Sequence, residues 1–267
     1  MKSCISFLLF LSLGWGWANA KAQLNESDTV KFQLRASITG NYQQGNVNIL
    51  TLRSRLDLTY APAKDFVFKS QNSSMYQEFS ALKADNEIYS RNYFYYMPKK
   101  RLYPFAIVYA STNYRRKIDS RLFAGAGFTY QLLNKGNHIF KLSASTVYEA
   151  NRFNGNRYNY NENDGSNTIN LWRTTLYAAG WNYLLNRHLR LYYDAYWQPA
   201  LSNKNNYRTQ FDIGIDLRVW KGLLLNVLYT FAHENVVIKN VKQQDKILTF
   251  GLGYGFKANS RKNFSAK

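Results

Sequence analysis

The chain has very little cysteine and proline, and it has no long apolar run beyond its first residues. Of its 267 residues, 1 is cysteine and 4 are proline. The cysteine, Cys4, lies in a leader that we expect to be removed. The mature chain is therefore expected to have no disulfide, thiolate metal site or cysteine nucleophile. No later stretch approaches the ~18 apolar residues of a transmembrane helix.

The leader has the pattern of a secretory signal peptide. Lys2 precedes an apolar core at residues 5–17, and residues 18–20 and 20–22 both form small-x-small cleavage sites. The apolar core is too short to span ~30 Å of hydrocarbon comfortably, which argues against a membrane anchor. We predict a signal peptide at residues 1–22, cleaved after Ala20 or Ala22, and export to the bacterial outer membrane.

Acidic residues are also scarce. The chain has 35 lysines and arginines against 16 aspartates and glutamates, a net charge of +19. Such a charge often indicates a nucleic-acid partner. Here the basic residues alternate with apolar residues along the whole chain and form no compact patch, so we expect no nucleic-acid partner.

The dominant pattern after residue 30 is an alternation of apolar and polar residues with period two, which is typical of strands. About twelve segments follow it, and most have the ten to fourteen residues of a tilted strand that crosses a bilayer. The fold predicted is an all-β, transmembrane antiparallel barrel of the outer-membrane type. The predicted strands are 31–44, 47–60, 66–78, 87–97, 102–114, 121–133, 138–150, 169–184, 188–199, 206–219, 222–234 and 245–257.

The connections support this prediction independently. If the amino terminus is periplasmic, the periplasmic turns are short and the opposite end carries longer loops, which include 80–86, 115–120 and 151–168. Short turns at one end and long loops at the other are typical of outer-membrane barrels. The predicted domains are a short segment at 23–30, a barrel at 31–257 and a polar tail at 258–267.

The stretch ILTFGLGYGF at residues 247–256 places large apolar side chains at every second position, with Thr or Gly between most of them. The large side chains are expected to face lipid, and the glycines to face a crowded lumen. Thr249, Gly251, Tyr254 and Phe256 resemble the polar-x-Gly-x-x-aromatic-x-aromatic signal that the barrel-assembly machinery reads. That signal usually ends a protein, whereas a polar tail follows it here.

Two further segments carry a family resemblance. Residues 36–52 read ASITGNYQQGNVNILTL and lead into Leu56–Tyr60 through a Gly45–Asn46 turn, and residues 123–128 read FAGAGF. Together with 248–256, they resemble domain-of-unknown-function family 481 (DUF481), whose members are described as salt-induced outer membrane proteins. The resemblance implies an outer-membrane barrel and no particular reaction.

Candidate site residues follow from the alternation. The charged residues assigned to the lumen are Arg35, Arg53, Arg55, Asp57, Arg190, Asp194, Arg208, Asp212, Asp216 and Arg218. Both signs are present, so either ion pairs fill the interior or a wet lumen passes small solutes; the number of carboxylates favours the first. Arg115, Arg116 and Lys117 lie in a predicted outer loop and are expected to contact lipopolysaccharide phosphates.

No catalytic motif is apparent. His138, His188 and His233 are far apart in the sequence, no serine lies in a nucleophile motif, and we expect no metal site and no cofactor. The leading hypothesis is a non-enzymatic outer-membrane barrel with a structural, envelope-stress or small-solute role, in contact with outer-membrane lipid. The alternatives are a lipid-acting hydrolase that uses His233, and a soluble periplasmic barrel that binds an apolar ligand.

Overall fold

The computed structural model describes residues 26–27, 30–45, 48–160, 162 and 164–260. The predicted signal peptide, most of the segment at 23–30 and residues 261–267 of the tail lie outside this part. The strands of the described part are β1 (Val30–Gln43), β2 (Ile49–Tyr60), β3 (Phe66–Phe79), β4 (Leu82–Tyr96), β5 (Leu102–Asn113), β6 (Ile118–Lys135), β7 (His138–Phe153), β8 (Thr168–Leu184), β9 (Leu189–Pro199), β10 (Tyr207–Trp220), β11 (Leu223–Glu234) and β12 (Gln244–Ser260). A single 3₁₀ turn, η2 (Leu185–Arg187), connects β8 to β9.

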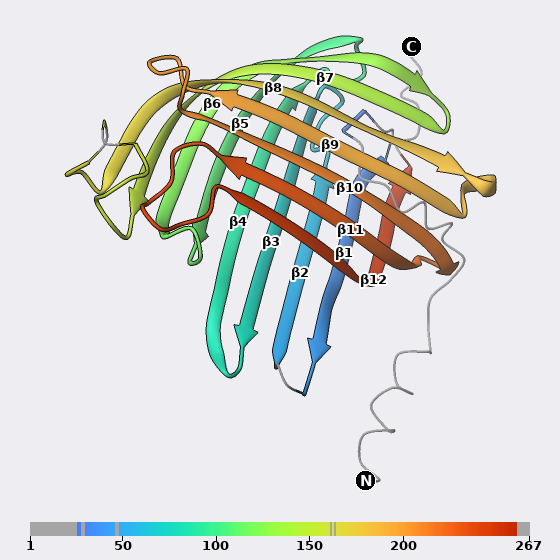
Figure 1. Cartoon of the computed structure of the whole chain (residues 1–267). Coiled ribbons are helices and arrows are strands. Elements are labelled where there is room, and N and C mark those ends of the chain that lie inside the picture. The colour runs from blue at the N-terminus through green and yellow to red at the C-terminus, as the bar shows by residue number, and fades with distance from the viewer. Residues whose placement is uncertain (1–25, 28–29, 46–47, 161, 163, 261–267) are drawn as a thin grey trace.

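The twelve strands form one closed antiparallel barrel. Each strand pairs with its neighbours in the chain, and β1 pairs with β12 to complete the sheet (Figure 1). In this seam Leu34 lies opposite Phe256 and Thr39 lies opposite Gly251. Closure leaves no unpaired strand edge, which a sheet in lipid requires. The predicted all-β barrel of about twelve strands is confirmed.

The wall of the barrel has an apolar outer face and a buried inner face. On β12, Leu248, Phe250 and Leu252 expose 62%, 56% and 53% of their surfaces, whereas Thr249 between them exposes 3%. The same alternation runs along most strands because successive side chains point to opposite faces of a sheet. No helix in the described residues is long and apolar enough to cross a membrane.

The two ends of the barrel differ. The connections at one end, which we call the short-turn end, include residues 61–65, 97–101, 136–137 and 221–222. The other end, the loop end, carries the longer connections 154–167, 200–206 and 235–243. β1 begins and β12 finishes at the short-turn end.

The predicted loop at 80–86 is wrong. β3 and β4 continue to a tight turn at Ser80 and Ala81, whose φ angles are +48° and +65°. Two successive left-handed residues give the turn that matches the twist of a hairpin, but Ser and Ala rarely adopt it, so the sequence gives no turn signal there. The register of this hairpin shifts between Gln77 and Glu78.

Candidate functional site in the barrel interior

The interior of the barrel holds most of the charged side chains of the wall. The residues that the alternation assigned to the lumen all lie on the inner face, next to outward residues of the same strands. Of these, Arg35, Asp57, Arg190, Arg208 and Asp216 are buried, and Arg53, Arg55, Asp194, Asp212 and Arg218 are half-buried. A charge in such a place is costly unless an opposite charge is close to it.

Ion pairs cross the barrel near the loop end. Asp85 on β4 forms an ion pair with Arg115, with 3.1 Å between Oδ2 and Nε. Arg115 and Arg116 both bind Asp245 on β12, at 3.2 and 2.6 Å. Arg116 also lies 3.4 Å from Glu234 on β11. The connection between β5 and β6 is thereby attached to the opposite side of the barrel.

The network continues from Glu234 to the far wall. Arg121 on β6 pairs with Glu234, with an Nη2–Oε2 distance of 3.2 Å, and its Nε donates to Asn151 Oδ1 at 2.7 Å. Asn151 in turn donates to Glu149 Oε1 at 2.7 Å. We call the ion pairs from Asp85 to Glu149 and its arginines the loop-end network.

Glu149 is, with Asp85, one of two fully buried carboxylates of this network. It exposes 0% of its surface and pairs with Arg173 at 3.0 Å (Oε1–Nε) and with Arg208. Arg173 also donates to the backbone oxygens of Gln198 and Asn206, at 3.1 and 3.0 Å. The one carboxylate therefore joins β7 to β8 and β10.

A second ion-pair group lies on β1, β9, β10 and β11. Arg35 and Arg190 both bind Asp216, at 2.6 Å (Nη2–Oδ1) and 2.8 Å (Nε–Oδ2). Asn226 donates to Asp216 Oδ1 at 2.7 Å, and both guanidinium groups lie over the ring of Tyr192. Asp216 thus links the strands that flank the seam of the barrel.

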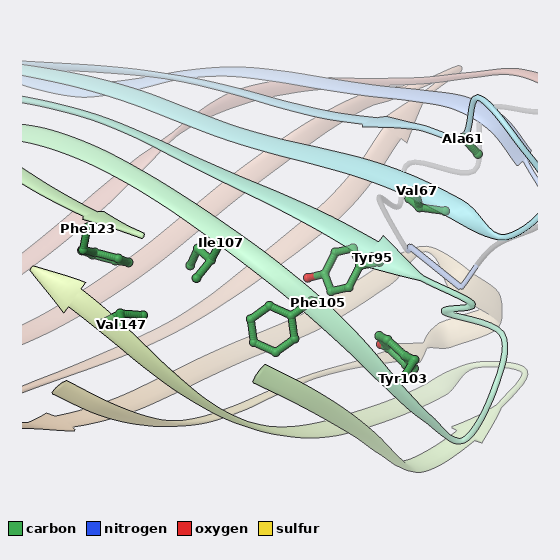
Figure 2. Close-up of a cluster of buried hydrophobic side chains, with 8 residues drawn as sticks. All are labelled: Ala61, Val67, Tyr95, Tyr103, Phe105, Ile107, Phe123 and Val147. Carbon is green, nitrogen blue, oxygen red and sulfur yellow. The ribbon is translucent and has the colours of Figure 1, made fainter. Parts of the chain in front are cut away.

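The opposite part of the interior is apolar and aromatic. Inward side chains of β3 to β7 and Ala61 of the 61–65 connection form a packed cluster that Figure 2 shows. Its members are Ala61, Val67, Tyr95, Tyr103, Phe105, Ile107, Phe123 and Val147. Tyr103 exposes 0% and Val147 exposes 1% of their surfaces. The rings of Tyr109 and Phe123 stack at 4.4 Å between centroids. This cluster fills volume that an open channel would leave to water.

A carboxylate from outside the barrel wall enters at the short-turn end. Glu26, which precedes β1, is buried and binds Lys141 at 2.6 Å and Lys69 at 3.5 Å, and Tyr103 donates to it at 2.9 Å. Burial by itself would raise the pKa of Glu26, but Lys141 and Lys69 outweigh it and hold that pKa well below its ordinary value of 4.5. These contacts therefore hold Glu26 inside the barrel.

Replacing Glu26 with glutamine is expected to make stability less dependent on acid pH. Because the folded pKa is depressed, the contribution of the ionised group is fully present above the unfolded pKa and is lost as pH falls below about 4.5. We expect Glu26→Gln to lower the free energy of unfolding, measured in urea at pH 7, by about 1.5–3 kcal/mol relative to the wild type. At pH 3.5 the difference in unfolding free energy between the variant and the wild type is expected to be smaller. Glu162→Gln, on an exposed loop, is the control. A difference that stayed constant with pH would contradict the role given to Glu26.

The loop end of the barrel is covered by its own connections. Ile118, Phe153, Tyr158, Val236 and Ile238 form a second apolar cluster there. Tyr158 and Ile238 pair as an isolated β-bridge, which joins the 154–167 connection to the 235–243 connection. Asn159 adds hydrogen bonds to Asn235 O at 2.8 Å and from Val237 N at 2.9 Å.

Three small cavities lie among the described residues of the interior. A cavity of about 60 Å³ lies beside the aromatic cluster, another of about 60 Å³ lies among Arg53, Arg55 and Asp212, and one of about 10 Å³ lies beside Arg173. A water molecule needs at least ~10–15 Å³, so each of the two larger cavities has room for a few waters. Arg91, stacked near Tyr89 and Tyr109, lines both of them.

The three residues expected to contact lipopolysaccharide differ in their exposure to solvent. Lys117 is exposed, but Arg116 is buried in the loop-end network and Arg115 is held by Asp85 and Asp245. The outer-surface position expected of all three is therefore wrong for Arg116, because two carboxylates on β11 and β12 draw it inward. No local pattern around Arg116 indicates these partners, which lie more than a hundred positions away.

The residues of the proposed assembly signal lie on β12. Thr249 and Gly251 face inward, and Tyr254 faces outward with 41% of its surface exposed. Phe256 is half-buried opposite Leu34 in the seam. The signal thus lies along the strand that closes the barrel.

The histidines lie in separate places. His138 hydrogen-bonds Asn182, His188 contacts Leu185 O, and the ring of His233 lies 5.6 Å from that of Tyr207. In the described residues no hydrogen bond joins a histidine ring to a serine hydroxyl, and no group of three or more His, Cys, Asp or Glu residues could hold a metal ion. These residues give no support to a hydrolase.

Sequence reasoning missed many of the interior residues. The alternation could not assign Tyr93, Tyr95 and Phe105 to the inner face, because both faces of β4 and β5 carry aromatic or apolar residues. Arg121, Arg173 and Glu234 do fall on the inward positions of their strands, so a stricter use of the alternation would have found them. Glu26 lies before the first strand, where no alternation exists.

A comparison with known protein families gives a match that covers nearly the whole barrel. Residues 36–256, from β1 to β12, match the family described as "Protein of unknown function, DUF481". The chain belongs to DUF481. The match includes each segment on which the sequence resemblance depended, and the family assignment is confirmed.

Solved structures similar to this DUF481 member are barrels at low sequence identity. The NanC porin is 7% identical, with a TM-score of 0.47, over 85% of this chain and 100% of that chain. The β domain of the Bordetella autotransporter BrkA is 11% identical, with a TM-score of 0.42, over 86% and 99%. The KdgM porin is 11% identical, with a TM-score of 0.42, over 84% and 99%. A comparison with curated proteins gives no match.

Proposed function

We propose that this protein is a non-enzymatic outer-membrane barrel whose interior is closed at rest, and that its role in the envelope is structural. The observation that carries the proposal is the apolar outer wall. Leu52, Leu122, Trp172, Leu225 and Phe250 come from five different strands, and each exposes 45–56% of its surface. In water this belt would be a very large apolar patch, whereas in a bilayer it faces hydrocarbon.

The filled interior supports the closed state. The loop-end network crosses the lumen, the aromatic cluster occupies the side formed by β3 to β7, and the cavities named above hold a few waters at most. At the short-turn end Glu26 binds Lys141, and at the loop end the second apolar cluster packs against the ends of the strands. Among the described residues, this packing would obstruct the passage of a hydrated solute.

The proposed partners follow from the two surfaces. Outer-membrane lipid would contact the apolar belt, and lipopolysaccharide phosphates would meet Lys117 rather than Arg115 or Arg116. The barrel-assembly machinery would read Thr249, Gly251, Tyr254 and Phe256 during insertion. Flotation of the mature protein with liposomes, resistant to carbonate and urea, tests the membrane location; extraction without detergent would instead support a soluble periplasmic barrel.

A planar-bilayer recording tests the closed interior. We expect the refolded wild-type protein to insert and remain silent, because side chains occupy the lumen. The matched comparison is Glu26→Gln, which removes the charge that pairs with Lys141 and Lys69. Discrete steps from the wild type would contradict the closed barrel. Steps from the variant alone would favour a second function, a gated passage for small solutes.

A further inference from the structure

The apolar belt is interrupted on β3 and β4. Halfway along these strands the outward positions carry hydroxyl and amide side chains. On β2 and β5, the residues that pair with Ser70, Asn72 and Asn92 are Leu58, Leu56 and Val108. We call this group the polar wall patch; its members are Ser70, Asn72 and Ser74 on β3 and Ser90 and Asn92 on β4. It is also the region in which the sequence alternates poorly.

The patch is contiguous and deep in the wall. Ser70 lies opposite Asn92, and Asn72 lies opposite Ser90. Toward the short-turn end, two aromatic pairs flank it: Phe66 with Tyr96, at 5.0 Å between ring centroids, and Phe68 with Phe94, at 5.2 Å. Aromatic pairs of this kind mark the membrane interface in outer-membrane barrels, so the patch faces the hydrocarbon beyond them.

The hydrogen-bonding capacity of the patch is only partly used. Asn72 Nδ2 donates to Ser70 Oγ at 2.9 Å, and Asn92 Nδ2 donates to Ser90 Oγ at 3.0 Å. In the described part of the chain, no hydrogen bond ends on the side-chain oxygen of either asparagine. Polar atoms without partners are costly in hydrocarbon, where no water replaces the missing bonds.

The side chains of the patch are also shorter and less exposed than the apolar side chains at its borders. Ser70 exposes only 7% of its surface and the other four members are half-buried, whereas Leu56, Ile88, Phe94 and Val108 at the borders of the patch expose 46–50%. Short side chains between long ones let another wall approach closely. Close approach and polar side chains that bond across an interface are the features by which proteins associate within a bilayer.

We propose that the polar wall patch is the contact surface for a second copy of this chain, related by a two-fold axis. Each serine and asparagine both donates and accepts, so the patch is complementary to itself, as a two-fold interface requires. Its five members carry no charge, so two copies meet without repulsion despite the net charge of +19. The inference rests on the proposed membrane location and is independent of whether the lumen conducts.

The experiment uses the whole protein in lipid. Since Cys4 is the only cysteine of the chain and lies in the expected leader, Ser90→Cys provides a single thiol in the patch, and Thr209→Cys provides one on the outward face of β10. We expect oxidation of outer membranes to give disulfide-linked pairs of copies for Ser90→Cys and not for Thr209→Cys. A Ser90→Cys link to a different polypeptide, or no link, would overturn the proposal.

A second measurement removes the patch. The double variant Asn72→Leu with Asn92→Leu is expected to lower the fraction of two-copy particles in liposomes by at least ~10-fold, as counted by single-molecule photobleaching. The matched control is Thr174→Leu with Thr209→Leu, outward on β8 and β10. Single copies of the wild type at every lipid ratio, or equal pairing of both variants, would refute the proposal. Flotation of the same samples separates this result from a failure to insert.

Discussion

Replacing Glu149 with alanine is expected to destabilise the barrel by about 3–5 kcal/mol, because truncating one member of a buried ion pair leaves the other charges uncompensated. Arg173 and Arg208 lose their shared carboxylate, and Asn151 loses the nearer of its two acceptors. All of these side chains are buried, so solvent cannot replace the lost partner.

Urea unfolding of the refolded protein in detergent measures this effect. The matched control is Glu162→Ala, an exposed carboxylate that accepts one hydrogen bond from Asn203, for which a change within about 0.5 kcal/mol is expected. An unchanged urea midpoint for Glu149→Ala would mean that water enters the loop-end network and screens the arginines.

A double variant separates charge from shape. Glu149→Gln with Arg173→Gln removes one charge of each sign from the same group. We expect the double variant to lose less unfolding free energy than the sum of the losses of the two single variants. The reason is that the two side chains are in contact, so their effects do not add. Additive losses would show that Glu149 does not act mainly through Arg173.

Gly251→Ala is expected to impair closure of the barrel. A Cβ at this position would lie 2.4 Å from the backbone oxygen of Ile38 and 2.6 Å from Thr39 Cα. Both are backbone atoms of β1, so relief requires β1 and β12 to separate at the seam. The expected cost is about 1–3 kcal/mol, with a lower yield of the folded, heat-modifiable form on refolding.

The neighbouring glycine provides the control for this prediction. A Cβ on Gly253 would lie 3.5 Å from Ser37 Cβ and 3.6 Å from Ala36 O, which is ordinary contact. Gly253→Ala is therefore expected to fold with nearly the wild-type yield. If the two variants folded equally well, the close approach at Gly251 would not limit closure.

Much of the fold could be predicted from the sequence because alternation is a local property. Leu248, Phe250 and Leu252 face outward as expected, and their small or polar neighbours face inward. Strand boundaries were less predictable. The turn at Ser80 and Ala81 depends on the pairing of β3 with β4, and neither residue type favours the backbone conformation that it adopts.

The interior could be predicted only in part. Alternation places Arg35 and Asp216 on the inner face, but they are 181 positions apart, and only the closed barrel brings them to 2.6 Å. Arg121 and Glu234 are 113 positions apart and meet in the same way. Which charges pair across a lumen depends on the register of every strand between them, and no local pattern contains that information.

The sequence by itself determined that this protein is a barrel with an apolar outer wall, because the period of two fixes the face on which each side chain lies. Only the tertiary structure decided what the inner face does. It turned Arg116 inward toward Glu234 and Asp245, packed Tyr95 and Tyr103 into the lumen, and set Glu26 against Lys141. These contacts form between distant segments, so they exist only once the sheet has closed.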